Sequence, residues 1–306
     1  MQRYILRRIL QMVPVLFAVS FLVFISVRLL PGDPARMIAG LEASEEVVQQ
    51  IRHELGLDQP LLIQYVRFLG GILTGDLGTS LYFNTPVYEE LAIRLPATLQ
   101  LALVGTALAV VIGVLGGVLS AMYRGKWIDQ LAIVLSLAGV SMPTFWLGIL
   151  FIQFFSVQLG WLPSSGYGTW KHLVMPALTL GLYGAGRIAR LTRSSMLEVL
   201  TADYVRTAHA KGLHPRAVVF KHAFLSAVIP VVTVTGLEFG SFLGKAVISE
   251  SVFAWPGIAR LIVDAVLHRD FPIIQGGVLW LALMFAGINV LVDVLYGYLD
   301  PRIRYT

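Results

Sequence analysis

Long apolar stretches alternate with shorter polar segments along this chain. A helix needs about 20 mostly apolar residues to cross the hydrocarbon core of a membrane, because each residue adds about 1.5 Å of length. The stretches that satisfy this requirement are residues 9–27, 97–122, 130–159, 172–189, 223–249 and 276–298. The pattern therefore predicts an all-α polytopic membrane protein with six transmembrane helices.

The basic residues near the ends of these stretches predict the orientation, because Lys and Arg are enriched on the cytoplasmic side. On one predicted side lie fourteen of the 23 basic residues, namely Arg3, Arg7, Arg8, Arg124, Lys126, Arg187, Arg190, Arg193, Arg206, Lys211, Arg216, Lys221, Arg302 and Arg304. The other side carries the remaining nine, and acidic residues dilute their charge. We therefore expect a multi-pass protein of the bacterial inner membrane with both termini in the cytoplasm.

The first apolar run also has to be distinguished from a signal peptide. At 19 residues it is longer than the apolar core of about 7–15 residues in a signal peptide, and no small-x-small cleavage pattern follows it. Residues 1–30 are therefore predicted to form an uncleaved N-terminal transmembrane helix.

Residues 31–96 separate the first predicted span from the second and are too long for a bare connection. Ser44 followed by two glutamates is a pattern typical of a helix N-terminus, and Gly56 ends the apolar stripe that follows. A second stripe follows Pro60. We expect a small extracytoplasmic helical insertion after the first helix, and a core transmembrane domain over residues 97–306.

Composition supports lipid as the surrounding solvent. Hydrophobic residues make up 57% of the 306 residues and charged residues 13%, and the mean hydropathy is +0.76. Soluble domains have about 45–50% apolar and about 25% charged residues. The formal net charge of +5 comes from residues placed between apolar runs, so it does not indicate a nucleic-acid-binding surface.

Residue patterns for catalysis are missing from the sequence. Residues 240–246 resemble a phosphate-binding loop, but the glycines are one residue too close and Ala246 replaces the required Ser or Thr. The six histidines lack a metal-binding spacing, there is no cysteine, and no G-x-S-x-G pattern occurs. We expect a non-enzymatic chain that carries no catalytic residue, metal or cofactor of its own.

The polar loop at about residues 194–222 is the most informative segment. It is rich in small residues, permits a helix, and places Gly212 where a short helix would end. A short helix that projects from a membrane bundle into the cytoplasm needs a partner to pack against. We therefore expect this loop to bind another protein.

The same loop carries a family resemblance. Residues 193–200 and 203–212 resemble the cytoplasmic loop of permeases in the dipeptide, oligopeptide, glutathione and nickel family of binding-protein-dependent ABC importers. Residues 206–208 (Arg-Thr-Ala) take the place of the Glu-Ala-Ala triplet of such permeases, and Gly212 follows at the family's distance. Residues 222–225 (His-Ala-Phe-Leu) replace the general Ile-x-Leu-Pro, as is typical of this branch.

The resemblance extends over nearly the whole chain and is closest in appearance to dipeptide and glutathione permeases. Further matching segments are residues 30–34, 75–78, 255–257, 269–272, 293–296 and 301–304. It implies a type I ABC importer permease that moves short peptides into the cytoplasm by alternating access. The implied partners are a homologous second permease, two cytoplasmic ATPase subunits that bind ATP and Mg, and an extracytoplasmic substrate-binding protein.

In this family the cytoplasmic loop forms a coupling helix that docks on an ATPase subunit. The residues that the resemblance assigns to this coupling are Tyr204, Arg206, Thr207, Ala208, Ala210, Lys211, Gly212 and Leu213.

Two charged residues interrupt the fifth predicted span. Glu238 lies near its middle, where a charge is costly, and Lys245 follows seven residues later on a similar face of the helix. Either the two line a translocation pathway and contact the charged ends of a substrate, or they form a structural pair, or the Lys245 side chain extends to the outer membrane interface.

Two other functions remain open from the sequence. A nickel-type substrate would fit the same family, and a self-sufficient channel or secondary transporter belongs to another class. The latter requires inverted repeats or a symmetric pore, and the sequence has no internal repeat. Co-purification with an ATPase separates the permease from the channel or secondary transporter.

Overall fold

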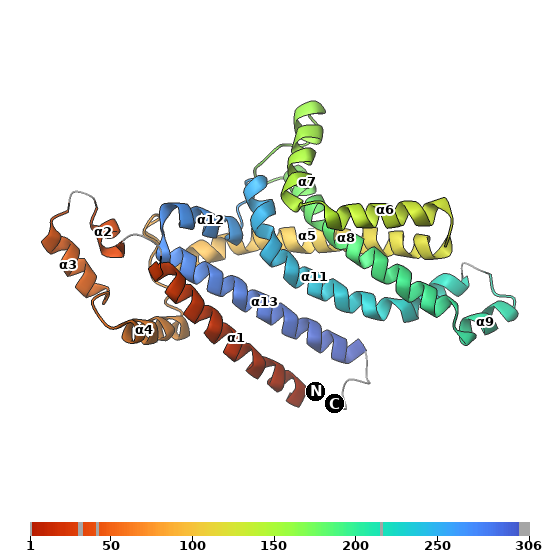
Figure 1. The fold of residues 1–306 in the computed structure, drawn as a ribbon, viewed down its shortest axis with the longest axis horizontal. Coiled ribbons are helices and arrows are strands. Elements are labelled where there is room, and N and C mark those ends of the chain that lie inside the picture. Colours follow the sequence, from red (N-terminus) through yellow and green to blue (C-terminus); the bar gives the residue numbers. More distant parts are fainter. Residues whose placement is uncertain (1, 30–32, 41–42, 215–216, 300–306) are drawn as a thin grey trace. The chain divides into compact units, whose positions relative to one another are not determined.

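A computed structural model describes residues 2–29, 33–40, 43–214 and 217–299 (Figure 1). The structure is built of helices, as the sequence predicts. The first elements are α1 (Gln2–Leu29), α2 (Pro34–Ala39), α3 (Glu45–Glu54), α4 (Leu61–Thr74), α5 (Val87–Met122) and α6 (Trp127–Ser141). They are followed by α7 (Thr144–Phe151), η1 (Ile152–Gln158), α8 (Trp170–Leu200), α9 (Asp203–Ala210), η2 (Val218–Ala223), α11 (Phe224–Val252), α12 (Ile258–His268) and α13 (Phe271–Leu299).

The chain forms two compact units. The first comprises Met1–Ile5, Ala97–Pro256 and Gly287–Thr306, and the second comprises Leu6–Pro96 and Gly257–Ala286. Helix α5 passes from the second unit to the first at Pro96, which lies inside this helix.

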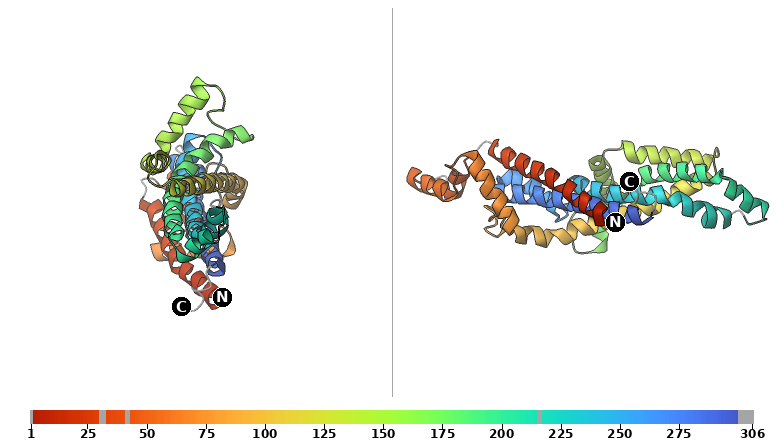
Figure 2. Two further views of the ribbon diagram at one scale, coloured as in Figure 1. Left: turned by 90° about the vertical axis from the view of Figure 1, so that its right-hand side faces the viewer. Right: turned by 90° about the horizontal axis from the view of Figure 1, so that it is seen from below.

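Helix α8 is the centre of the first unit. It packs against α6 on one side and α11 on the other, and these helices run alongside one another in Figures 1 and 2. Thirteen residues of α8 are buried. A helix covered by protein along much of its length does not need a continuous apolar surface, which is why α8 can carry glycines within its apolar stretch.

Glycines allow the backbones of the first unit to approach closely. A Cβ atom on Gly117 of α5 would lie 2.6 Å from the carbonyl oxygen of Ala189 on α8, and one on Gly186 of α8 would lie 2.4 Å from the carbonyl oxygen of Ser136 on α6. Small residues at such positions are the usual means of close helix contact in membranes. Around them lies a core of Ala97, Leu101, Ala109, Ala177, Leu180, Ile188, Val231, Phe242 and Trp255.

The predicted span at residues 130–159 is not one straight helix. It is formed by α6 and the pair α7–η1, whose axes differ by 105° (Figure 1). The break falls at Met142 and Pro143, where proline has no backbone N–H to continue the helix. Figure 1 shows α7 turning away from α6 and α8.

Four helical segments in the described part of the chain are long and apolar enough to cross a membrane. They are Ile5–Leu29, Val87–Met122, Val218–Val252 and Phe271–Val294, and the bent pair would make a fifth. The predicted span at residues 172–189 lies inside α8, where glycine, proline and arginine dilute the apolar residues. By length and composition, the structure thus supports four or five spans.

In the second unit, α4 packs against α1 through Tyr65. The Tyr65 hydroxyl is 2.9 Å from Ser20 Oγ, and its ring contacts Phe17, Phe21 and Phe24 edge-on. The two short helices predicted between the first two spans are confirmed: α3 begins after Ser44 and α4 begins after Pro60. Their place outside the membrane stays a prediction.

A buried carboxylate holds the loop before α5 to the start of α13. Asp270 is 1% exposed and accepts hydrogen bonds from the Ser80 hydroxyl and from the backbone N–H of Tyr82 at 3.2 Å. A Cβ atom on Gly78 would lie 3.8 Å from the side chain of Pro272. Two of the segments that carry the family resemblance, residues 75–78 and 269–272, therefore meet in space.

The glycine packing in α5 gives a direct test. Gly117→Ala forces a methyl group into the backbone of α8 and should destabilise the purified protein by about 1–3 kcal/mol, the usual cost of overpacking. Its neighbour Gly116 is the matched control, because a Cβ there would meet Ala189 at an ordinary 3.9 Å. Gly116→Ala should be neutral or stabilising by up to about 1 kcal/mol through its helix propensity. Equal thermal midpoints of unfolding for both variants would contradict this packing.

Candidate functional site

The coupling region contains the short helix expected from the sequence. Helix α9 has Asp203 in its first turn, where an acid is favourable, and the left-handed Gly212 (φ +75°) follows its end. The backbone N–H of Leu213 reaches back to the carbonyl of Ala208 at 3.4 Å. The prediction that Gly212 ends this helix is therefore confirmed. Pro215, three residues after Gly212, is a residue type that can begin a new element, and it lies outside the described residues.

Helix α9 has an inner and an outer face. Val205 and Ala208 are buried with residues of α5, α8 and η2, in a core of Val118, Ala121, Met196, Val205, Ala208, Val218, Val219, Ala223 and Ala227. The exposed residues of the region include Tyr204, Arg206, Thr207, Ala210, Lys211, Gly212 and Leu213.

Ala208 therefore has a different environment from the one expected. The sequence suggested that it allows close approach of a partner, but the structure places its methyl group against this chain's own core, with 7% exposure. The i, i+3 spacing of Val205 and Ala208 puts both on the inner face. The other expected contact residues remain accessible to a partner.

A four-donor clamp joins three helices just before α9. Asp129 of α6 accepts hydrogen bonds at both oxygens from Arg193 of α8, at 2.8 and 2.9 Å. Ser120 of α5 donates to the same carboxylate at 2.5 Å, and the backbone N–H of Gly125 donates at 2.9 Å. Bidentate guanidinium–carboxylate pairing is strong and geometrically specific, so the clamp fixes the ends of α5, α6 and α8 together.

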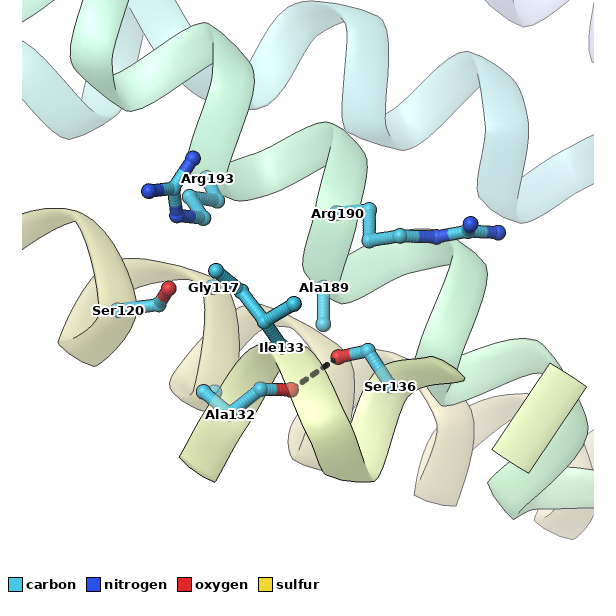
Figure 3. Close-up of a pocket in the computed structure, with 9 residues that line it drawn as sticks. Gly117, Ser120, Ala132, Ile133, Ser136, Ala189, Arg190 and Arg193 are labelled. Atoms are coloured by element: carbon cyan, nitrogen blue, oxygen red, sulfur yellow. Dashed lines mark hydrogen bonds between the residues drawn. The ribbon is translucent and has the colours of Figure 1, made fainter. Parts of the chain in front are cut away.

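A shallow depression lies beside this clamp (Figure 3). It holds about 170 Å³ of empty space, part of it open to solvent, and is lined by Gly116, Gly117, Ser120, Ala132, Ile133, Ser136, Ala189, Arg190 and Arg193. Ser136 Oγ is already bonded to the carbonyl of Ala132 at 2.6 Å. In Figure 3, Arg190 and Arg193 point in opposite directions from α8. The depression is thus a gap between packed helices that belongs to the clamp.

A second ion pair lies deeper in the first unit. Glu238, in the middle of α11, is 1% exposed, and its Oε1 lies 2.6 Å from Nη1 of Arg187 on α8. Glu238 Oε2 is buried and has no hydrogen-bond partner among the described residues. Lys245 is not the partner of Glu238 that the sequence suggested. Its Nζ lies 3.9 Å from the centre of the Tyr183 ring, a cation–π contact.

Sequence reasoning missed two of these residues. Asp129 had a local signal, since it is an acid in the first turn of an apolar helix. Arg187 was recognised only as a positive charge near a helix end, because nothing in the sequence shows that α8 and α11 pack together. In the part of the chain that the structure describes, no three His, Asp or Glu side chains lie close enough to hold a metal ion.

The sequence and the fold are those of a known class of membrane protein. A family model of the binding-protein-dependent transport system inner membrane component matches residues 113–305, and a model of the N-terminal region of such components matches residues 1–102. The chain belongs to this family. It is a non-catalytic, multi-pass permease component of a bacterial ABC transport system, which implies ATPase and binding-protein partners.

Individual relatives match along the whole chain. Glutathione transport system permease protein GsiC of Escherichia coli (strain K12) is 47% identical, and that of Salmonella paratyphi A (strain ATCC 9150 / SARB42) is 49% identical. Each alignment spans 305 residues and covers 100% of both proteins.

Solved structures show the same fold at much lower identity. An inward-facing MetNI methionine ABC transporter matches with a TM-score of 0.60 and 20% identity, over 69% of this chain and 96% of the other. An amino acid ABC transporter matches with a TM-score of 0.52 and 16% identity, over 77% and 98%.

The clamp predicts a large effect of removing its carboxylate. Asp129→Ala leaves Arg193 and the Gly125 N–H without their acceptor and should cost at least about 2 kcal/mol, since an ion stranded by loss of its buried partner is strongly destabilising. The measurement is the thermal midpoint of the purified protein in detergent. Asp203→Ala is the control, because Asp203 is 94% exposed beside Arg206 and its pairing is screened by water. A similar midpoint for both variants would show that the clamp does not stabilise the protein.

Proposed function

We propose that this chain is one of two homologous permease subunits of an ATP-driven importer that carries short peptides, glutathione among them, into the cytoplasm. The full-length identity to glutathione permeases supports the substrate class. The observation that carries the coupling role is the division of α9 into a face buried in this chain and a face left accessible.

The exposed face of α9 is the docking surface for a cytoplasmic ATPase subunit. Tyr204 offers an aromatic ring that is 47% exposed, while Arg206 and Lys211 offer donors for charged or polar partners. Two residues, Thr201 and Ala202, separate α9 from α8. Movement of an ATPase subunit that binds ATP and Mg is therefore passed to α8, and through the Asp129–Arg193 clamp to α5 and α6.

The permease crosses the membrane six times, with α8 as the span that is surrounded by protein. Gly181, Gly184 and Gly186 are buried against neighbouring helices, and Arg187 and Arg193 pair with carboxylates on α11 and α6, which offsets the low hydropathy of α8. Both termini and α9 lie in the cytoplasm, and residues 31–96 lie outside. The excess of basic residues on the side of α9 supports this orientation.

Alternating access takes place beside α11, where Glu238 and Lys245 lie on the translocation pathway. A carboxylate in the middle of a spanning helix faces protein or water rather than lipid, and Glu238 is covered by Arg187. The pathway role would thus place the charged groups of α8 and α11 where a charged peptide passes.

Reconstitution tests the function as a whole. The chain, its partner permease, both ATPase subunits and the binding protein are placed in liposomes, and uptake of labelled glutathione is measured. Uptake should require both ATP and the binding protein. Uptake by this chain alone, driven by an ion gradient, would instead identify a secondary transporter.

The docking surface predicts an assembly defect without a folding defect. Tyr204→Ala and Lys211→Ala change only exposed positions without a left-handed backbone, so the thermal midpoint of unfolding should stay unchanged while co-purification with the ATPase, or uptake per ATP hydrolysed, falls at least about threefold, as expected for loss of exposed contact residues. Arg124→Ala, an exposed change in another loop, is the control. Wild-type assembly and coupling in both variants would reject α9 as the docking site.

The orientation can be tested by labelling, because the chain has no native cysteine. Asn84→Cys should react with a membrane-impermeant thiol reagent in intact cells, and His214→Cys should react only after the membrane is opened. The reverse pattern would invert the topology.

A further inference from the structure

The two arginine–carboxylate pairs of α8 differ in how fully the carboxylate is satisfied. Asp129 accepts four hydrogen bonds, two of them from Arg193. Glu238 is contacted by Arg187 at Oε1, while its buried Oε2 has no donor among the described residues. Since buried polar atoms are nearly always hydrogen-bonded, the Glu238 carboxylate has room for one more donor.

Arg187 likewise uses only part of its hydrogen-bonding capacity in the contact with Glu238. The Arg187 side chain is 47% exposed, whereas that of Arg193 is 27% exposed, and the contact of Arg187 with Glu238 is made through Nη1. A guanidinium has five N–H donors in a fork that matches a carboxylate. Arg187 can therefore bind a second carboxylate, and its exposed side chain has space to turn toward one.

We propose that the Arg187–Glu238 pair is the closed form of a binding site for the charged ends of an unblocked peptide, an inference that rests on the proposed function. When the pathway opens, the ammonium group of the peptide binds Glu238, and the carboxylate of the peptide binds Arg187. One internal ion pair is exchanged for two pairs with the substrate. Neither Arg187 nor Glu238 is left without a charged partner before or after the exchange.

The exchange also sets a charge requirement for opening the Arg187–Glu238 pair. If Arg187 left Glu238 without a substrate, a buried carboxylate would lose its charged contact with Arg187, which is unfavourable inside a membrane protein. A solute with a single charge can satisfy one of the two partners but not both. The site therefore opens for zwitterions and stays closed to simple ions.

Lys245 adds a second positive charge to the same pair of helices. It lies seven residues after Glu238, about 10 Å along α11, and its contact Tyr183 lies one turn before Arg187 on α8. Two cations and one carboxylate give the site a net charge of +1. This charge complements an unblocked peptide with one more carboxylate than ammonium, and an extended tripeptide spans about 10 Å. Glutathione, with two carboxylates and one ammonium, has this chemistry.

The decisive variant removes both charges of the pair. Arg187→Met combined with Glu238→Leu strands no ion, so the complex should assemble and should keep ATP hydrolysis stimulated by the binding protein within about twofold of wild type, because buried ion pairs can often be replaced by apolar residues. Uptake of labelled glutathione into liposomes should nevertheless fall at least about tenfold, because the contacts to both peptide ends are lost. Wild-type uptake by this variant would overturn the proposal and make the pair structural.

A single variant covers the case in which the double variant does not assemble. Glu238→Gln keeps the shape of the side chain and an oxygen for Arg187, but it removes the charge that binds an ammonium group. Assembly should be normal and glutathione uptake lower by roughly tenfold, the size expected for one lost charged contact. Normal uptake by Glu238→Gln would overturn the proposal.

The role of Lys245 has its own conservative control. Lys245→Arg keeps the positive charge and the stacking on Tyr183 and should retain uptake, whereas Lys245→Met should lose it. Equal losses in both variants would reject the net charge of the site as a selector. These results are separate from the proposed function, which fails if the wild-type complex takes up no glutathione. The site inference fails if the wild type transports glutathione and the charge-free variant does so equally well.

Discussion

Every charge that α8 carries into the packed first unit has to be matched by a neighbour, and this constraint organises the unit. A buried ion without a partner costs several kcal/mol, even after the surroundings relax. Arg193 is matched by Asp129 from α6, and Arg187 by Glu238 from α11. Arg193 thus connects α8 to α6, and Arg187 connects α8 to α11. Apolar packing alone is weakly specific between membrane helices, because lipid is as apolar as the side chains it would replace. The charged pairs, together with the glycine contacts, fix which helices meet and in which register.

The two pairs have different chemical consequences. Both oxygens of Asp129 accept hydrogen bonds from side-chain and backbone donors. These four bonds fix the position of the carboxylate, which suits a rigid connection between helices. Glu238 is under-coordinated and covered by a half-exposed arginine, so its contact can be replaced by another of the same charge. A transporter needs both kinds of contact. The saturated pair is formed by α8, the helix that leads to α9, and the under-coordinated pair joins α8 to the middle of α11.

Much of the fold could be read from the sequence, because the signals concerned are local. The glycine after α9, the serine before α3 and the proline before α4 each act within one turn of the helix they end or begin. The fourth span was predicted from the length of an apolar stretch, and that length does not show which neighbouring helices cover the span. Helix α8 is buried by its neighbours, so its composition reflects protein contacts rather than lipid. The break at Pro143 was missed for a related reason, since a long apolar run can be satisfied by two helices at an angle as well as by one straight helix.

Contacts between helices could not be predicted in the same way. Glu238 and Lys245 share a face of α11, which made an internal pair a reasonable hypothesis. Seven residues correspond to about 10 Å, however, and that distance is too long for a direct ion pair when a neighbouring helix can supply an arginine at contact distance.

The environment of Ala208 likewise depends on a contact between helices that the sequence does not show. Its small size suits a close approach from outside, but Val205, one turn earlier, faces the chain's own core, and the helical period then turns Ala208 inward as well. The part of α9 left for a partner is consequently the side that carries Tyr204, Thr207 and Lys211. Because the opposite side is packed against α5 and α8, a displacement of this short helix cannot remain local.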